Sequence, residues 1–291
     1  MLARCFGYTL VLCVLATTSA FAQTPLRWKF AQGQVFEVER ITSQKQTVEI
    51  KGKQFKQDRQ STWHVRLEVQ ETDPENSRLT AVLTRVEHQL AGGAATEMVD
   101  PKLAEKMQGC SFTLRVTPHG KLSEFKGHAD FLKKLAGDDK GRIKAFSIMF
   151  PEESLKEAFA DLFGPLPEKR VVAGDAWAHA FVEPIPHFGS LRSTARYVYE
   201  GKSDQHDRIA YTIQTLYELP KDELMLLFRI VKGNIRSEQS RGTIQFDGMA
   251  GRLALHERSM LLRGTLTIES MDRQQPLDFT SLNEVKVRIK K

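Results

Sequence analysis

The sequence has 291 residues, of which 42 are Lys or Arg and 36 are Asp or Glu, giving a formal net charge of +6. This mild basic excess favours contact with anionic surfaces but does not identify nucleic acid as a partner, and we expect none. Beyond the N-terminal region no run reaches the roughly 18 apolar residues of a membrane-spanning helix. We therefore expect the rest of the chain to be soluble.

The first 22 residues have the pattern of a secretory signal. Arg4 is the only charge, an apolar run follows, and the small-x-small motif Ala20-Phe21-Ala22 marks a cleavage site. We expect cleavage after Ala22, a mature chain that begins at Gln23, and a periplasmic or secreted location; a retained N-terminal anchor is the alternative. Two of the three cysteines fall in this segment, so Cys110 is predicted to lack a disulfide partner.

Apolar and polar residues alternate through much of the first half, which predicts strands with one buried face. The predicted strands cover residues 26–30, 35–38, 63–70 and 79–90. A turn at residues 73–76 joins the last two, and the basic stretch 51–59 is predicted to be a loop. We expect His64 and His88 on outward positions of neighbouring strands.

The middle of the chain contains the helix signals. Residues 100–108 and 128–136 are predicted short helices, separated by a hairpin of strands 112–116 and 122–126 that turns at Gly120. A glycine-flanked loop is predicted at 137–141. Residues 151–163 form the clearest amphipathic helix, and Gly164 and Pro165 end it.

The second half is again predicted to consist of strands, at residues 177–181, 191–199, 209–219, 243–247, 252–268 and 277–289. Periodicity leaves 224–231 open, as a buried strand or a helical turn. Similar turns recur in the same order, with Gly33 matched by Gly174 and Gly120 by Gly251. This order favours an internal duplication over coincidental hairpins.

These patterns predict a mainly β (α+β) fold of two similar, curved antiparallel half-barrel sheets, with short helices between and packed under them. The expected regions are a signal peptide at 1–22, a first β half at 23–136, a helical connection at 137–170 and a second β half at 171–291.

Three motifs carry a family resemblance beyond the export signal. They are the opening Gly33-Gln34-Val35-Phe36, the hairpin Pro118-His119-Gly120-Lys121-Leu122, and the restart from Leu166 to Trp177, which reads LPxxxVxxGDxW. This pattern resembles an uncharacterised family of exported bacterial proteins, a domain of unknown function common in planctomycetes. A curved sheet over short helices also resembles the LolA-type lipoprotein carriers, which cradle acyl chains. The motifs are turn signatures, so neither resemblance implies functional residues.

No catalytic, cofactor-binding or metal-binding pattern stands out in the sequence. Ser123 and Lys126 match an SxxK string, but on a strand residues three apart face opposite ways. The pair His128 and Asp130 lacks the further ligands that a zinc site needs. A lone cysteine beside a strand, such as Cys110, is typical of a buried core. We therefore expect no enzyme activity, no cofactor and no metal.

Aromatic strand faces beside a helix rich in Phe and Leu suggest a ligand-binding hollow. The candidate ligand-binding residues are Trp63, Phe159, Phe163, Trp177, Phe181 and Tyr211. The predicted function is a non-enzymatic exported envelope protein that binds a lipid or another apolar or amphiphilic ligand. A closed aromatic core is the alternative for the residues, and a structural or protein-interaction component of the envelope is the alternative function. The oligomeric state is not predicted.

The last predicted strand carries a row of basic residues, Lys286, Arg288 and Lys290. Such a row protects an exposed edge strand from aggregation, or it contacts anionic headgroups at a membrane surface.

Overall fold

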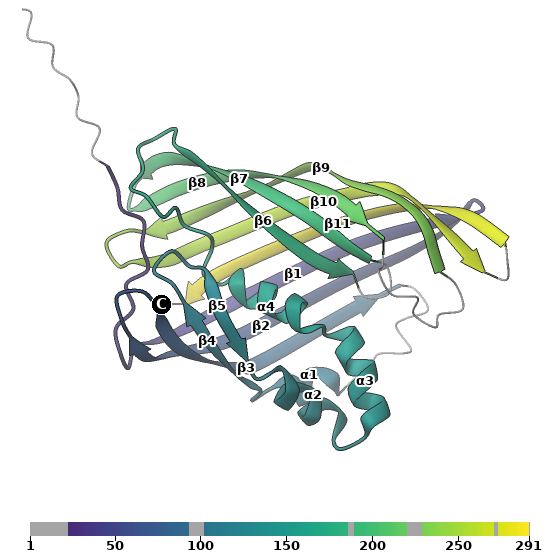
Figure 1. Ribbon diagram of the computed structural model, residues 1–291, viewed down its shortest axis with the longest axis horizontal. Helices are drawn as coiled ribbons and strands as arrows, with labels where there is room; N and C mark the ends of the chain where they lie inside the picture. The colour runs from purple at the N-terminus through teal and green to yellow at the C-terminus, as the bar shows by residue number, and fades with distance from the viewer. Residues whose placement is uncertain (1–22, 93–101, 186–188, 220–228, 271–272, 291) are drawn as a thin grey trace, which may run out of the picture.

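The computed structural model describes residues 23–92, 102–185, 189–219, 229–270 and 273–290. One antiparallel sheet of eleven strands dominates it, in the order β5-β4-β3-β2-β1-β11-β10-β9-β8-β7-β6 (Figure 1). The mainly β prediction is confirmed, whereas the prediction of two half-barrel sheets is wrong. The predicted signal peptide lies outside the described residues.

Most of the strands are long, whereas β4 and β5 have 6 and 5 residues. The strands are β1 (Val35–Ile50), β2 (Lys53–Thr72), β3 (Ser77–Ala91), β4 (Ser111–Val116), β5 (Leu122–Lys126), β6 (Ala176–Ile185), β7 (Gly189–Ser203), β8 (His206–Glu218), β9 (Arg229–Asp247), β10 (Arg252–Ser270) and β11 (Arg273–Lys290). The helices are α1 (Leu103–Met107), α2 (His128–Ala136), α3 (Lys140–Met149) and α4 (Glu152–Ala160).

The pairing of β1 with β11 makes the two halves of the chain one sheet. Its register runs from Glu37 opposite Lys290 to Glu49 opposite Asp278. Two separate sheets would leave the backbone groups of both long strands unpaired, and an unpaired edge is a template for aggregation. Joining the first and last strands satisfies both rows of hydrogen-bonding groups.

The sheet ends at β5 and β6, and helix α4 contacts both of these edge strands. Pro151 precedes the helix, and Glu152 and Glu153 stand in its first turn, where carboxylates interact favourably with the helix dipole. Leu155 and Phe159 are its buried residues. The helices gather under one part of the sheet, and the β1–β2 and β10–β11 hairpins extend past them (Figure 1).

Residues 26–30 alternate as predicted but do not form a strand of the sheet. Leu26 and Trp28 are buried. The Trp28 amide donates to the Pro118 carbonyl at 2.8 Å, and the Lys29 amide donates to the Gly251 carbonyl at 2.9 Å. The segment thus runs between two hairpin turns. Its alternation arises because one side of the segment is buried, although it pairs with no strand of the described sheet.

Two loops are shorter than the sequence predicts. The basic stretch 51–59 turns only at Lys51 and Gly52, which have φ of 50° and 75°, and β2 begins at Lys53. In the predicted loop 137–141, helix α3 already begins at Lys140. Asp139 caps this helix by accepting a hydrogen bond from the Arg142 amide at 3.0 Å. Part of the predicted helix 100–108 and most of 224–231 lie outside the described residues.

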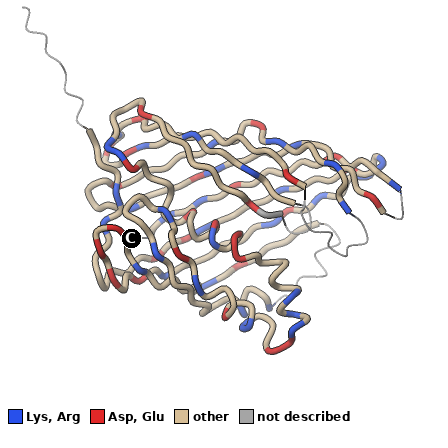
Figure 2. Tube along the Cα trace, viewed as in Figure 1, with Lys and Arg blue, Asp and Glu red and all other residues tan. Residues whose placement is uncertain are grey.

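We call the face of the sheet that packs against the helices the inner face, and the opposite face the outer face. Arg40 and His256 point inward, since both contact Asp161 just after α4. Their strand neighbours therefore point outward. A register shift between His64 and Val65 turns His88 inward, opposite Ser61, so the predicted outward position of His88 is wrong. Acidic and basic positions are spread over the whole trace (Figure 2).

Candidate functional site

A buried ionic network links the end of α4 to the inner face of the sheet. The Asp161 carboxylate accepts a hydrogen bond from Arg40 Nη2 at 3.0 Å, and Arg258 Nη1 approaches it to 3.3 Å. Burial opposes ionisation of Asp161, but Arg258 and Arg40 together hold its pKa below the usual value. Arg40 also lies over the Trp63 ring, 5.6 Å from its centroid. The network fixes the helix against β1 and β10.

His256 extends this network to β8. Its Nδ1 lies 3.1 Å from the Asp161 carbonyl, which can only accept, so Nδ1 carries the proton. Nε2 is then an acceptor, and the Tyr211 hydroxyl donates to it at 2.7 Å. Burial lowers the pKa of His256 despite the nearby Asp161, which favours this neutral tautomer. Every polar atom of the imidazole has a partner, so we assign it a structural role.

Glu157 lies one helical turn before Asp161 on the same side of α4. Burial raises its pKa to about 7, and the charges of Asp161 and Glu183 contribute to the rise. Glu183 belongs to the edge strand β6. The contact between α4 and β6 therefore brings carboxylates together.

The six predicted ligand residues lie in two environments. Phe159 and Phe163 are fully buried, and Trp63 is nearly so, with its ring 6.2 Å from that of Phe159. These three belong to the core, so a ligand could reach them only by displacing packed side chains. Tyr211 is buried, and its hydroxyl forms the hydrogen bond with His256. Trp177 and Phe181, on β6, are half-buried.

A polar band crosses the inner face of β2, β1 and β11. This band was not identified from the sequence. Its members are short or amide side chains on inward positions of the aligned strands: Ser61, Gln57, Gln44, Gln46, Ser281 and Asn283. The Gln57 amide nitrogen and the Ser61 hydroxyl are buried and have no hydrogen-bond partner among the described residues. Buried polar atoms of this kind normally have partners, so these two are candidates for binding a ligand or water.

An apolar rim follows the polar band toward the β1–β2 turn. It consists of Phe55, Val48, Ile50 and Phe279 on inward positions. Phe55 is 55% exposed, and the other three are half-buried. The inner face thus passes from the closed core through a polar band to accessible apolar side chains.

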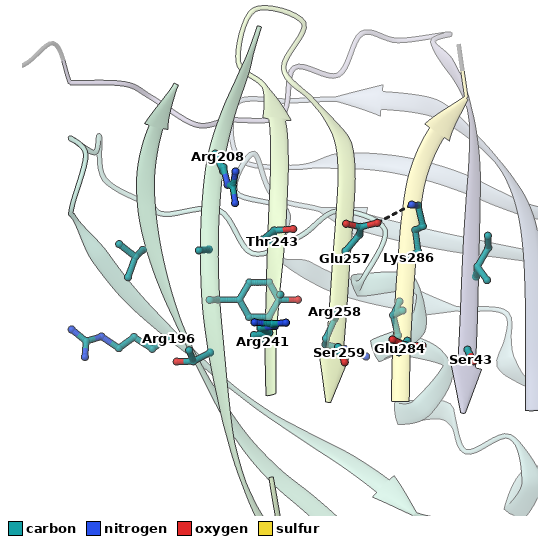
Figure 3. A pocket seen from close by; sticks show the side chains of 17 residues that line it. Ser43, Arg196, Arg208, Arg241, Thr243, Glu257, Arg258, Ser259, Glu284 and Lys286 are labelled. Atoms are coloured by element: carbon teal, nitrogen blue, oxygen red, sulfur yellow. Dashed lines mark ion pairs between the residues drawn. The ribbon is translucent and has the colours of Figure 1, made fainter. Parts of the chain in front are cut away.

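The outer face carries a hollow of about 950 Å³ over β7 to β11 and β1. Its lining includes short outward side chains, those of Ser43, Ala210, Thr212 and Ser259. Longer charged side chains surround them in Figure 3, among them Arg196, Arg241 and Glu284. The hollow therefore results from side-chain length on a curved sheet. A smaller hollow of about 260 Å³ also lies on the outer face, over β2 and β3.

The charges around the larger hollow differ in whether they are paired. Glu257 pairs with Lys286 at 2.8 Å (Figure 3), and Arg208 pairs with Glu200 at 2.7 Å. Arg196 and Arg241 form no ion pair within the part of the chain that the structure describes. The hollow thus has two unneutralised guanidinium groups at one end.

The predicted edge-strand role of the basic row in β11 is wrong, because β11 lies between β1 and β10. Lys286 pairs with Glu257, and both Arg288 and Lys290 pair with the buried carboxylate of Glu39. The basic row therefore serves cross-strand ion pairs at the centre of the sheet.

The other sequence candidates have structural partners. Cys110 is buried and free, burial raises the pKa of its thiol, and its Sγ contacts the Lys106 carbonyl at 3.7 Å. Ser123 stands on β5 and donates to the Arg115 carbonyl at 3.1 Å. His128 contacts the Phe150 carbonyl at 2.8 Å. Across the described ranges, no group of three or more His, Cys, Asp or Glu residues could hold a metal ion.

Helices of the described residues are all too short or too polar to cross a membrane. No protein-family model matches the chain, and no curated protein matches it in sequence.

Solved structures give only distant likenesses to this chain. A lipovitellin structure covers 90% of this chain and 26% of its own at 8% identity, with a TM-score of 0.48. An outer membrane channel from Pseudomonas putida covers 91% of this chain and 98% of its own at 11% identity, with a TM-score of 0.22. The DynF protein of Micromonospora chersina covers 97% and 92% at 9% identity, with a TM-score of 0.19. This chain thus spans about a quarter of the lipovitellin chain.

Proposed function

We propose that this chain is an exported, non-enzymatic protein that binds a single-chain amphiphile on the inner face of β1, β2 and β11. The observation that carries the proposal is the order of the regions on that face, from the closed core through the polar band to the apolar rim. The buried Gln57 amide nitrogen and Ser61 hydroxyl have no hydrogen-bond partner among the residues that the structure describes, and the exposed Phe55 ring lies beyond them. A polar head would satisfy the first two groups, and an acyl chain would cover the apolar rim.

Physical chemistry favours an amphiphile over a purely apolar ligand at this place. An unsatisfied buried donor costs about 1–3 kcal/mol, and a head group with acceptor oxygens would remove that cost. Covering the exposed half of Phe55 would add about 1 kcal/mol from apolar burial. Neither gain alone gives useful affinity, but an amphiphile obtains both together with contacts to Val48, Ile50 and Phe279.

The experiment is a titration of the purified protein with dansylated undecanoic acid, followed by competition with lauric acid. Phe55→Ala should weaken binding about fivefold, from the loss of about 1 kcal/mol of apolar contact. Leu216→Ala is the matched control, because Leu216 is 67% exposed on the outer face. Failure of the probe to saturate, or an equal effect of both substitutions, would count against the proposal.

A role in protein interaction is the second candidate, and one observation favours it. Leu216 and Val182 flank Arg192 on the outer face of β6 to β8, and both are exposed. An exposed apolar pair beside an arginine is typical of an interface centre. Site-specific photo-crosslinking from position 216 in intact cells should give one discrete adduct, absent from position 66. A smear, or the same products from both positions, would contradict this candidate.

A further inference from the structure

We propose that the outer hollow binds a phosphate group, held between Arg196 of β7 and Arg241 of β9. This site lies on the face opposite the proposed amphiphile site and does not depend on it. The group could come from a soluble phosphate monoester or from the head of an anionic lipid, and the same guanidinium chemistry would recognise both.

The strand register brings the binding groups into one row. Arg196 is opposite Thr212, which is opposite Arg241, and Ser259 follows on β10. Neighbouring strands are spaced by about 4.8 Å, so the two arginine Cα atoms lie about 10 Å apart with the Thr212 hydroxyl between them. The Arg196 side chain extends away from Arg241 in Figure 3, so the two guanidinium groups would converge on one anion above the threonine after a change of the Arg196 rotamer.

Several features mark this row as a site rather than a chance pair of surface charges. The short side chains of Thr212, Ala210 and Ser259 leave room for a ligand in the hollow. A register shift in β9 occurs beside Arg241, where Gln239 has a φ of 49°. Bulges of this kind re-aim side chains next to functional sites.

Charge decides the class of ligand. The two guanidinium groups, which have no ion pair with any described residue, match the two negative charges of a phosphate monoester. Arginine binds phosphate oxygens in a bidentate manner. Glu284 stands two strands from Arg241 in the same row, about 10 Å away by strand spacing. Its negative charge repels a bound anion, so the anion is expected at the arginine end of the hollow.

The test is isothermal titration of the full chain with glycerol phosphate, alongside flotation with phosphatidylcholine vesicles that do or do not contain phosphatidic acid. Arg196→Ala and Arg241→Ala should each weaken binding about tenfold or more, since a hydrogen bond to a charged group contributes about 1.5–3 kcal/mol. Arg196→Lys should retain part of the affinity, because it keeps the charge and loses the planar fork. Glu284→Gln should strengthen binding about twofold by removing a like charge.

The matched control is Arg66→Ala, which removes one exposed arginine from the outer face of β2. Glycerol phosphate binding with this mutational pattern would support a soluble ligand. Binding of phosphatidic acid vesicles alone, with the same pattern, would support a lipid head. Absence of both, or an equal loss with Arg66→Ala, would overturn the proposal. Thermal melts of each variant establish that the exposed substitutions leave the fold intact.

Discussion

Arg258 of β10 and Asp161, the residue that follows α4, form a buried ion pair with 3.3 Å between Nη1 and Oδ1. This contact joins the centre of the sheet to the helix that contacts both of its edges. It stabilises the fold only while both charges are present, because a buried charge without its partner is costly.

Asp161→Asn should destabilise the protein by about 3–5 kcal/mol, since it leaves the guanidinium groups of Arg40 and Arg258 buried without a counter-charge. Urea unfolding followed by circular dichroism measures this change. Asp138→Asn is the control, because Asp138 is highly exposed and the expected change is within about 0.5 kcal/mol. Equal midpoints for the two variants would refute the assigned role of Asp161.

The same carboxylate predicts loss of stability in acid. Its folded pKa is lowered from 3.8, so the stabilisation is present above about pH 4 and is lost as the pH falls through the folded pKa. The unfolding free energy of the Asp161→Asn variant should therefore depend less on pH between about pH 2 and 5. An unchanged acid limb would show that other carboxylates control acid unfolding.

Glu157 predicts the opposite dependence on pH. Burial raises its folded pKa to about 7 from 4.5, so its ionisation destabilises the fold as the pH rises from 4.5 through 7. Glu157→Gln should therefore increase stability by about 1–2 kcal/mol at pH 8 and change little at pH 4. Unfolding in urea at the two pH values tests this. A gain of equal size at both would contradict the titration of Glu157.

Tyr211→Phe should cost about 1–2 kcal/mol, because it leaves the buried Nε2 of His256 without its donor. Tyr197→Phe is the control; its hydroxyl has no hydrogen bond within the described residues. Nitrogen-15 NMR of the parent protein at pH 7 should show His256 neutral with its proton on Nδ1. A protonated His256, or the other tautomer, would contradict the assigned direction of both hydrogen bonds.

Gly242→Ala should be strongly destabilising, by roughly 2–4 kcal/mol in the range of core overpacking and strain. A Cβ at this position would lie 2.2 Å from the Tyr211 ring and 2.5 Å from the Glu257 carbonyl oxygen. Near-ultraviolet circular dichroism should report the displaced tyrosine. Thr243→Ala, one residue further on the outer face, should leave that signal unchanged. A stable Gly242→Ala protein with the parent spectrum would contradict the packing of Tyr211 on this strand.

The duplication stays a prediction, but the topology is compatible with it. Strands β1–β5 and β6–β10 are two meanders that cross the sheet in the same direction, with β11 between them. Gly120 and Gly251, which suggested the repeat, both have positive φ, at 77° and 62°. A Cβ on Gly120 would lie 2.2 Å from the Gly164 carbonyl oxygen, so this glycine is required by close approach as well as by the turn.

The candidate sites were hard to predict because each combines residues from several strands. Arg196, Thr212 and Arg241 have no sequence spacing that relates them, and the strand register alone makes them neighbours. The basic neighbours of Phe55 mask the alternation there, so the sequence predicts a loop. The sequence does mark Trp63 and Phe159 as inward aromatics, but periodicity cannot distinguish a filled core from an open face.

The sequence by itself determined the strand character of the chain, its buried faces and an amphipathic helix within 151–163, because alternation with periods of 2 and 3.6 is a local property. Tertiary structure alone decided that β11 pairs with β1 and that α4 lies against both sheet edges. It also decided which charges remain unpaired on the outer face. Strand order and register depend on hydrogen bonds between segments far apart in the chain, and no local pattern contains that information.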